Sequence, residues 1–339
     1  MGFFVQGYVT LSIVAAFLIT FFVSPFVITK CKKIFKSKKQ AAGKKKVPTG
    51  GGIIFIPVMV FFFIFFVFKD FSEFYISIFL ILMILGSIVI AVLGALYDKK
   101  GLRLRTRLIV QTVAVVIPVC FLPDIFLDVN DYLEKMMFVL VWLGFVNVYS
   151  LSDRIEGNVV LQSIAIGIVG AFLVPAISVL FLIIIASLIG FLRVNSPSSK
   201  CKVLIGSIGS SFLGYILMGL MFVSLVVDIS VVWSFITITI LLTADILYTL
   251  LKRIIRKEKP LRGDYKDFWI DRMQTLKFSY NKILALGAFA NIALIIIVVL
   301  TYDNAGRFIS PVLGAIVFAC YAGYVYYYEN KKRNQTVRD

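Results

Sequence analysis

The stretch GSIGSSFLGYILMGLMFVSLV, residues 206–226, begins with glycine and serine and continues without a charged residue. An α-helix needs about 20 apolar residues to cross the hydrocarbon core of a bilayer, and this stretch is long enough. Small residues at its start are typical of a helix that packs closely against its neighbours, although backbone amides at a helix start also bind phosphate. The stretch therefore predicts a membrane-spanning helix whose polar end either packs against neighbouring helices or binds phosphate.

Ten further apolar runs resemble this stretch. The chain of 339 residues is 60% hydrophobic and 16% charged, with a mean hydropathy of +0.97, whereas soluble domains carry about 25% charged residues. We therefore predict an all-α polytopic membrane protein. The candidate spans are 3–29, 52–68, 73–97, 107–127, 133–152, 158–177, 178–193, 206–226, 230–250, 281–301 and 308–328. Only Pro175 separates the sixth run from the seventh, so ten spans are an alternative to eleven.

The basic residues divide the loops into two sets. Of the 35 lysines and arginines, all but Lys69, Lys135 and Arg307 lie at 30–46, 99–107, 153–157, 193–202 and 252–282 or after residue 328. The other loops carry the acidic residues Asp70, Glu73, Asp124, Asp128, Asp131, Asp228 and Asp303. Cytoplasmic loops are enriched in lysine and arginine, so we predict an amino terminus outside the cell and a carboxyl terminus in the cytoplasm. The predicted location is the cytoplasmic (inner) membrane.

We expect residues 1–339 to form a single integral membrane domain. Its cytoplasmic loops are predicted near 30–51, 98–107, 153–157, 194–206 and 252–281. The net charge of +17 fits loops that lie beside anionic lipid headgroups, and we expect no nucleic-acid binding. Four widely spaced cysteines predict neither a disulfide framework nor a zinc site. Because the chain has no histidine, histidine-based acid–base catalysis and metal ligation are excluded.

Four polar segments on the predicted cytoplasmic side contain the candidate functional residues. They are 94–102, 147–157, 204–214 and 253–279. In the second segment, five small or polar residues recur at helical spacing: Asn147, Ser150, Asp153, Arg154 and Gly157. This spacing places them along one helical face, which suits either hydrogen bonding between helices or a ligand.

Several other features allow two interpretations each. The three glycines at 50–52 form an anion-binding turn or a flexible hinge. Asp98, followed by two lysines, suits a helix-end charge cluster or a catalytic carboxylate. Asp245 inside the ninth run is a site residue or the partner of Lys252 and Arg253. The basic residues of the last loop suit phosphate or lipid headgroups equally well; they are Arg253, Arg256, Lys257, Lys259, Arg262 and Arg272.

Together these segments resemble the polyprenyl-phosphate N-acetylhexosamine-1-phosphate transferase family. Residues 48–52 are similar to its Pro-Thr-x-Gly-Gly loop. Residues 94–102 are similar to its Gly-x-x-Asp-Asp-x-x-Gly-Leu motif, and Arg107 and Gln111 continue the Arg-Leu-x-x-Gln that follows. Three further stretches match in order: 147–157 resembles Asn-x-x-Asn-x-x-Asp-Gly-x-Asp-Gly, 206–214 resembles Gly-Asp-x-Gly-Ser-x-x-Leu-Gly, and 268–273 falls where the family carries His-x-His-His-Arg-Leu.

The resemblance implies a transferase in which polyprenyl phosphate attacks the first phosphate of a UDP-amino sugar and UMP leaves, with Mg²⁺ held by carboxylates. It implies Asp98 and Asp153 as catalytic residues, and Asp98, Asp153 and Glu156 as metal ligands. The implied substrate-binding residues are Pro48, Thr49, Gly51, Gly52, Asn147, Ser150, Arg154, Gly206, Gly209, Ser210 and Arg272. The implied partners are polyprenyl phosphate, a UDP-amino sugar and membrane lipids, with a second copy of the chain or other envelope-synthesis proteins as further candidates.

Several positions depart from the family pattern. Tyr97 replaces the first Asp of the Asp-Asp pair, and Ser207 replaces the Asp of Gly-Asp-x-Gly-Ser, so both are degenerate partners of the catalytic acids. Ser150 and Arg154 replace an Asn and a Gly, and no histidine remains. A neutral hydroxyl supplies no formal charge to Mg²⁺, and removing preorganised charge slows phosphoryl transfer by orders of magnitude. Arg154 would oppose a divalent cation or hold a phosphate directly.

We therefore expect a divergent member of the family, a pseudoenzyme candidate that retains lipid-phosphate binding while catalysis is impaired or lost. Such a protein needs no cofactor. The alternative is an active Mg²⁺-dependent transferase that uses Asp98, Asp153 and Glu156 as its ligand set. A lipid-linked sugar transporter or flippase is a third interpretation, although no duplicated half supports it.

Overall fold

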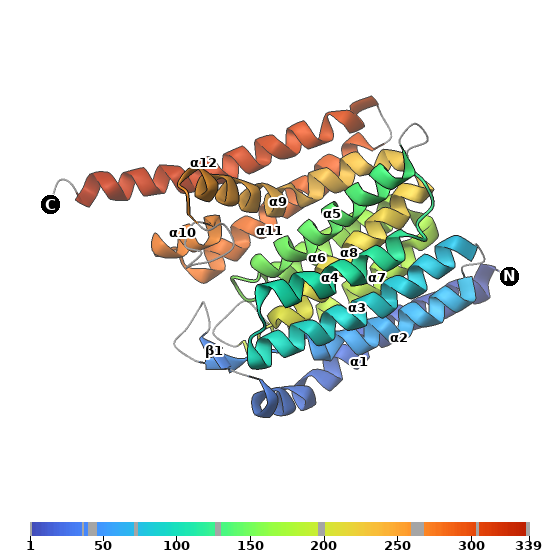
Figure 1. Cartoon of the computed structure of the whole chain (residues 1–339). Coiled ribbons are helices and arrows are strands. Elements are labelled where there is room, and N and C mark those ends of the chain that lie inside the picture. The colour runs from blue at the N-terminus through green and yellow to red at the C-terminus, as the bar shows by residue number, and fades with distance from the viewer. Residues whose placement is uncertain are drawn as a thin grey trace. The chain divides into compact units, whose positions relative to one another are not determined.

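The computed structural model describes residues 2–35, 37–39, 46–70, 74–125, 130–195, 201–258, 268–302 and 305–336. The chain is helical over most of these residues (Figure 1). Its internal contacts group it into two compact units, Met1–Val231 and Val232–Asp339, and each is described by itself. The expected single membrane domain with five cytoplasmic loops stays a prediction.

The first unit consists of α-helices and one short hairpin. The helices are α1 (Gly2–Ile34), α2 (Gly52–Asp70), α3 (Phe74–Lys100), α4 (Leu104–Val119), α5 (Asp131–Leu151), α6 (Asn158–Leu173), α7 (Ser178–Leu192) and α8 (Gly206–Val227). Short 3₁₀ turns lie at Pro175–Ile177 and Ile229–Val231. The hairpin pairs β1 (Ser37–Lys39) with β2 (Lys46–Pro48) in antiparallel register, and it was not expected from the sequence.

The second unit contains four α-helices in its described residues. They are α9 (Val232–Ile255), α10 (Trp269–Thr275), α11 (Tyr280–Thr301) and α12 (Ser310–Thr336), with a 3₁₀ turn at Ala305–Phe308. The long helix α9 packs against α11 and α12, and the short helix α10 contacts the same two helices.

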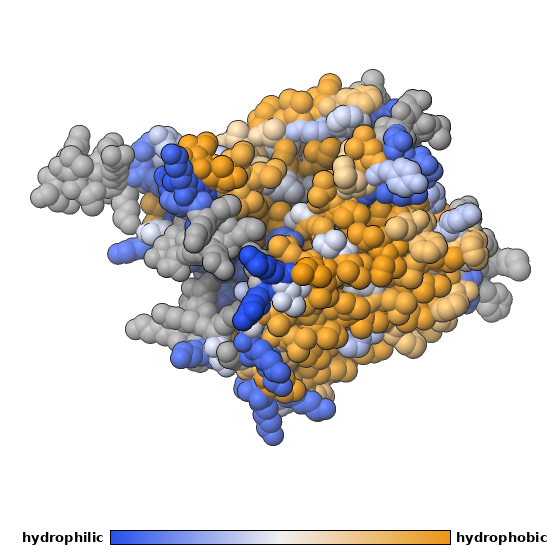
Figure 2. Space-filling model, viewed as in Figure 1, coloured by the Kyte–Doolittle hydropathy of each residue, from blue (hydrophilic) through white to orange (hydrophobic). Residues whose placement is uncertain are grey.

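The length and composition of the helices are those of a membrane protein. Within the described ranges, 9 helices are long and apolar enough to cross a membrane. Large apolar side chains face outward along them, and Phe26, Phe61 and Phe68 expose 75%, 63% and 76% of their surface. Figure 2 shows a broad hydrophobic face over the first unit. Such exposure is favourable only against lipid, so the protein is an all-α, multi-pass membrane protein, as the sequence predicts.

Two expected spans are shorter than predicted. Helix α4 ends at Val119 instead of continuing to 127, because Pro118 and Pro123 disfavour further helical turns. Helix α6 ends at Leu173, since Pro175 begins a 3₁₀ turn. Beyond that turn α7 starts as a separate helix and packs against α6. The sixth and seventh apolar runs are therefore two separate helices. In the described part of the chain, nine helices are long and apolar enough to span a membrane and α6 is a shorter apolar helix, so the number of spans stays a prediction.

Helix α8 forms the centre of the first unit. It packs against α2, α3, α5 and α6, and 89% of the residues in its apolar stretch are buried. Glycine permits this close packing, because a Cβ on Gly214 would lie 2.6 Å from the Cβ of Tyr149. The buried polar tips find partners: Trp142 Nε1 donates to the carbonyl of Tyr215 at 3.0 Å, and Tyr215 Oη donates to the carbonyl of Ala114 at 2.6 Å. Close packing, one of the two predicted uses of the small residues, is thus observed.

Successive helices of the first unit run in opposite directions, which brings the predicted polar segments to one end. The ends of α1, α3, α5 and α7 lie at the same end of the unit as the starts of α2, α4, α6 and α8 (Figure 1). Hydrophilic residues gather where α1 and α3 end, whereas hydrophobic residues cover the face between the two ends (Figure 2). The candidate site of this unit is built at that end.

Candidate functional site

The glycine loop before α2 is fixed to the segment before α8. Leu204 N donates to the carbonyl of Pro48 at 3.0 Å, Gly51 N donates to the carbonyl of Leu204 at 2.8 Å, and Gly52 N donates to the carbonyl of Ile205 at 3.2 Å. This ladder is incompatible with a flexible hinge. It also engages the amides of Gly51 and Gly52, so neither of these two N–H groups points at an anion in this arrangement.

The same two segments touch backbone to backbone one turn further on. A Cβ on Gly52 would lie 2.6 Å from the backbone nitrogen of Gly209. Ser210, also a predicted binding residue, is fully buried and donates its hydroxyl to the carbonyl of Gly206 at 3.0 Å. The close approach of Gly52 and Gly209 therefore brings the start of α8 against the start of α2, while the Ser210 bond lies within α8.

Asp98 lies where these two loops meet the end of α3. Its side chain is 5% exposed. Gly206 adopts a φ of +70°, and a Cβ on it would lie 2.5 Å from Asp98 Oδ2 and 3.4 Å from the Cβ of Thr49. Gly206 is thus required both for its left-handed backbone and for the space that the carboxylate occupies. Of the predicted site residues, Asp98, Thr49 and Gly206 form one close group.

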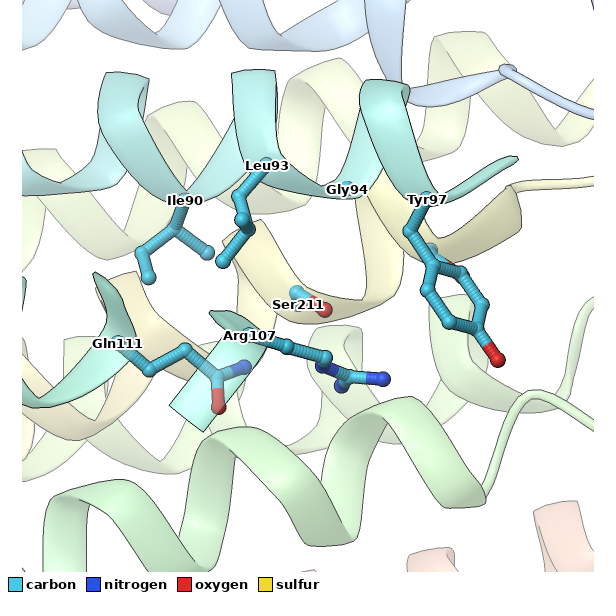
Figure 3. Close-up of a pocket in the computed structure, with 8 residues that line it drawn as sticks. Ile90, Leu93, Gly94, Tyr97, Arg107, Gln111 and Ser211 are labelled. Carbon is cyan, nitrogen blue, oxygen red and sulfur yellow. The ribbon is translucent and has the colours of Figure 1, made fainter. Parts of the chain in front are cut away.

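A crevice opens on the other side of the contact between α3 and α8. The two helices cross closely, because a Cβ on Gly94 would lie 2.5 Å from the carbonyl oxygen of Ser207. The gaps in this crevice do not admit a water molecule. Figure 3 shows the side chains that line it. Its lining residues are Ile90, Leu93, Gly94, Tyr97, Arg107, Gln111, Ser207 and Ser211.

Both degenerate acid positions, Tyr97 and Ser207, line this crevice together with a cation. Tyr97 projects from the end of α3, and Arg107 reaches toward it from α4 (Figure 3). The guanidinium carbon of Arg107 lies 5.4 Å from the centroid of the Tyr97 ring, which is cation–π distance. Where the family pattern has two acids, this chain therefore has two neutral hydroxyls beside a guanidinium.

The polar stripe of α5 contacts α4 through one residue. Asn147 Nδ2 donates to the carbonyl of Leu143 at 2.8 Å and to Gln111 Oε1 at 3.2 Å. Gln111 itself is 0% exposed. This contact supports hydrogen bonding between helices as the role of Asn147. Ser150, one turn later, is half-buried.

The loop after α5 carries the other predicted acids. Asp153 and Arg154 are half-buried, and Arg154 Nε donates to the carbonyl of Leu151 at 2.8 Å. Glu156 is 5% exposed. Gly157 ends the loop with a φ of +84° and donates its N–H to the side-chain oxygen of Asn195 at 3.0 Å.

Asn195 is a positioning residue that sequence reasoning missed. It is 0% exposed, and its Nδ2 donates to the carbonyl of Val203 at 2.9 Å while its Oδ1 holds the N–H of Gly157. It therefore ties the loop before α6 to the segment before α8. The only signal in the sequence is an asparagine at the end of an apolar run, which does not reveal burial.

The second unit contains its own polar cluster. Trp269 N, at the start of α10, donates to Asp245 Oδ1 at 3.2 Å. The Trp269 ring stacks on the Tyr248 ring with centroids 5.8 Å apart. The guanidinium carbon of Arg272 lies 4.1 Å from the centroid of the Trp269 ring. Asp245 thus caps α10. Lys259 and Arg262, also predicted in this loop, lie outside the described residues.

Arg272 is bound by a carboxylate of its own chain. Its Nε donates to Glu329 Oε1 at 2.6 Å, and its NH2 group pairs with Glu329 Oε2. This two-pronged pairing is the geometry by which arginine binds carboxylates, so Glu329 engages two of the guanidinium nitrogens of Arg272. Glu329 was not singled out from the sequence.

Comparison with known proteins agrees with the motifs. The family model described as glycosyl transferase family 4 matches residues 80–226, a range that includes every residue lining the crevice. The phospho-N-acetylmuramoyl-pentapeptide-transferase of Streptococcus thermophilus strain CNRZ 1066 is 31% identical over 241 residues, covering 60% of this chain and 68% of the relative. The same enzyme from strain ATCC BAA-250 / LMG 18311 matches with the same values. The chain belongs to glycosyl transferase family 4. The predicted family is thereby confirmed.

The resemblance to this family implies Mg²⁺, and the residues present do not fit it. In the described part of the chain, no three carboxylate or thiol side chains lie close enough to hold one metal ion. Among the described residues, Asp98, Asp153 and Glu156 therefore do not form the expected ligand set. Oxygen ligands with negative charge are what Mg²⁺ requires, and the crevice of this family 4 protein supplies hydroxyls and a guanidinium.

Proposed function

We propose that this protein binds polyprenyl phosphate in the cytoplasmic membrane, and that its transfer of sugar-1-phosphate from a UDP-N-acetylhexosamine is impaired or lost. One observation carries the proposal: Tyr97 and Ser207 stand at the acid positions of the family pattern and line one crevice with Arg107. The relatives are named as phospho-N-acetylmuramoyl-pentapeptide-transferases, which suggests a role in cell-envelope glycan synthesis.

The electrostatics of the crevice support a loss of transfer activity. Phosphoryl transfer depends on cations that neutralise the charge developing on the phosphate oxygens, and carboxylates normally hold those cations in place. Tyr97 and Ser207 carry no formal charge, and the guanidinium of Arg107 repels a divalent cation from the same space. Loss of preorganised charge at such a site costs orders of magnitude in rate.

The surroundings of the crevice support retained binding of a lipid phosphate. Exposed apolar side chains along the helices suit a polyprenyl tail, while the polar end of the first unit offers hydrogen-bond donors to its headgroup. Under the predicted topology this end faces the cytoplasm, where the phosphate of such a lipid lies. The alternative of an active Mg²⁺-dependent transferase requires Asp98, Asp153 and Glu156 to act together, and these three are not clustered in the part of the chain that the structure describes.

Release of UMP from UDP-sugars tests the proposal. Purified protein, supplied with undecaprenyl phosphate, Mg²⁺ and either UDP-GlcNAc or UDP-MurNAc-pentapeptide, is expected to release no UMP above the rate without protein. The double variant Tyr97→Asp, Ser207→Asp restores two carboxylates to the crevice and is expected to gain activity. Turnover by the unmodified protein that Asp98→Asn abolishes would sink the proposal. Tyr97→Asn with Ser207→Asn is the matched control, because it changes size without adding charge.

A further inference from the structure

The hydrogen bonds of Asn147 show which atom of the Gln111 side-chain amide faces α5. Asn147 Nδ2 donates both to the carbonyl of Leu143 and to Gln111, so the atom that Gln111 presents to Asn147 must be its oxygen. The nitrogen Nε2 therefore points away from α5. It is buried, and none of the described residues provides it with a hydrogen-bond acceptor. Figure 3 shows this amide at the inner end of the crevice, on the same side as Arg107.

A buried donor without an acceptor is unfavourable, and native proteins rarely retain one without a ligand, a water molecule or a function to explain it. Gln111 Nε2 opens on the space that Ser207 and Ser211 also line, from the first turns of α8. None of the described side chains that line this space accepts a hydrogen bond from Nε2.

The lining of the crevice is composed of hydrogen-bond donors and apolar groups. Arg107 contributes a guanidinium, Gln111 contributes Nε2, and Tyr97, Ser207 and Ser211 contribute hydroxyls. No carboxylate is among the lining residues. Such a set is complementary to the acceptor oxygens of a phosphate and not to a cation, because each of its groups can donate and only the hydroxyls can also accept.

We propose that the crevice between α3, α4 and α8 is a phosphate site that works without a metal ion, with Gln111 at its inner end and Arg107 at its mouth. The inference deepens the proposed function, on which its choice of lipid ligand rests, by naming the atoms that hold the phosphate. Tyr97 is 38% exposed and forms the rim with Arg107. Because the gaps in the crevice do not admit a water molecule, entry of a phosphate requires the crevice to widen, with Arg107 leaving the Tyr97 ring and turning its guanidinium onto the anion.

Binding measured with and without a metal ion tests the proposal. The full chain in nanodiscs is titrated with undecaprenyl phosphate or with UDP-GlcNAc, each in EDTA and in Mg²⁺. At least one of the two probes is expected to bind in EDTA, with a Kd within about threefold of its Kd in Mg²⁺. Binding of the lipid probe assigns the site to a headgroup, and binding of UDP-GlcNAc assigns it to a soluble diphosphate. A requirement for Mg²⁺, or no binding of either probe, overturns the proposal.

Two variants at Ser207 separate charge from size. Ser207→Asn keeps a donor and is expected to preserve binding in EDTA. In Ser207→Asp the new side chain has nearly the volume of the asparagine but places a negative charge in the crevice. Binding of the phosphate probe in EDTA is therefore expected to weaken by about tenfold to a hundredfold. If Mg²⁺ restores binding to Ser207→Asp, the introduced carboxylate binds the metal ion, and the unmodified crevice lacks that ligand. Equal affinities of the two variants in EDTA would contradict the proposal.

Gln111→Glu gives an independent test at the inner end. A glutamate still accepts from Asn147 but presents an oxygen instead of Nε2, so binding in EDTA is expected to weaken by about tenfold or more. Unchanged affinity in a folded Gln111→Glu variant would show that Nε2 does not contact the ligand. These binding results do not depend on turnover. UMP release by the unmodified protein would refute the proposed loss of catalysis, whereas binding in EDTA would still decide whether this phosphate site works without a metal ion.

Discussion

At the scale of single residues, the contact between Asp98 and Gly206 shows how closely the site is built. Asp98 is almost fully buried at the end of α3, and the space for its carboxylate exists because position 206 has no side chain. Gly206 also has a φ of +70°, which disfavours other residues. Two separate physical requirements thus converge on one glycine.

Replacing Gly206 by alanine is expected to lower the free energy of unfolding by about 1–3 kcal/mol from backbone strain, with a further loss from the contact of the new Cβ with Asp98. The thermal unfolding midpoint in detergent measures this loss. Gly101→Ala is the matched control, because Gly101 has a similar φ of +74° and a Cβ added there would meet no atom within 4 Å. Similar losses for both variants would show that Asp98 does not press on position 206.

The residue types of Tyr97, Ser207 and Arg107 do not by themselves show that these side chains lie together. The motifs predict that Tyr97 and Ser207 stand at acid positions of the family pattern, but the sequence does not show that both line one crevice with Arg107. Arg154 was the cation expected to oppose a metal ion, and the structure adds Arg107, which lines the same crevice as Tyr97 and Ser207. The reason is side-chain direction, which depends on how α3, α4 and α8 are rotated against one another.

At the scale of elements, the loops between helices are held by hydrogen bonds that join distant parts of the sequence. The segment before α8 pairs with the loop before α2 through Leu204, and with the loop before α6 through Asn195. A flexible hinge was one expectation for the glycines at 50–52. The amides of Gly51 and Gly52 donate to carbonyls of the segment before α8, which favours an ordered turn over a hinge. The start of α8 is thereby held from two sides.

Asn195→Ala is expected to release the loop before α6. The substitution leaves the buried N–H of Gly157 and the carbonyl of Val203 without this partner, and each such group costs about 1–3 kcal/mol. Hydrogen exchange measured by mass spectrometry should rise at 152–157. Asn158→Ala serves for comparison, since the Asn158 side chain is only half-buried and its bond to the carbonyl of Ser152 is 3.4 Å long. Unchanged exchange in Asn195→Ala would rule out this anchoring role.

At the scale of the whole molecule, the apolar runs account for the architecture. Each predicted span corresponds to a helix. Helix α6 ends early before Pro175 and α4 ends early at Val119, whereas α1, α9 and α12 extend beyond the predicted ends. The small hairpin of β1 and β2 was not predicted, because three-residue strands in a lysine-rich loop have no recognisable hydrophobic pattern.

The predicted orientation can be tested by cysteine labelling. In a background with Cys31, Cys120, Cys201 and Cys320 replaced by serine, Lys135→Cys is expected to react with a membrane-impermeant maleimide in intact cells. Lys99→Cys, at the end of α3, should react only after the membrane is permeabilised. The opposite pattern would invert the topology and place the crevice on the outer face.

The sequence by itself determined the class of this protein, the position of its apolar helices along the chain, and its family. Those properties depend on the length of apolar runs and on motifs that are local in the chain, so they can be read without knowing the packing. Only the tertiary structure decided that Tyr97, Arg107, Gln111 and Ser207 line one crevice, and that the Gln111 amide presents its nitrogen to it. The physical reason is that a site shared by three helices depends on their mutual rotation and on hydrogen bonds between them, and neither is encoded in any one segment.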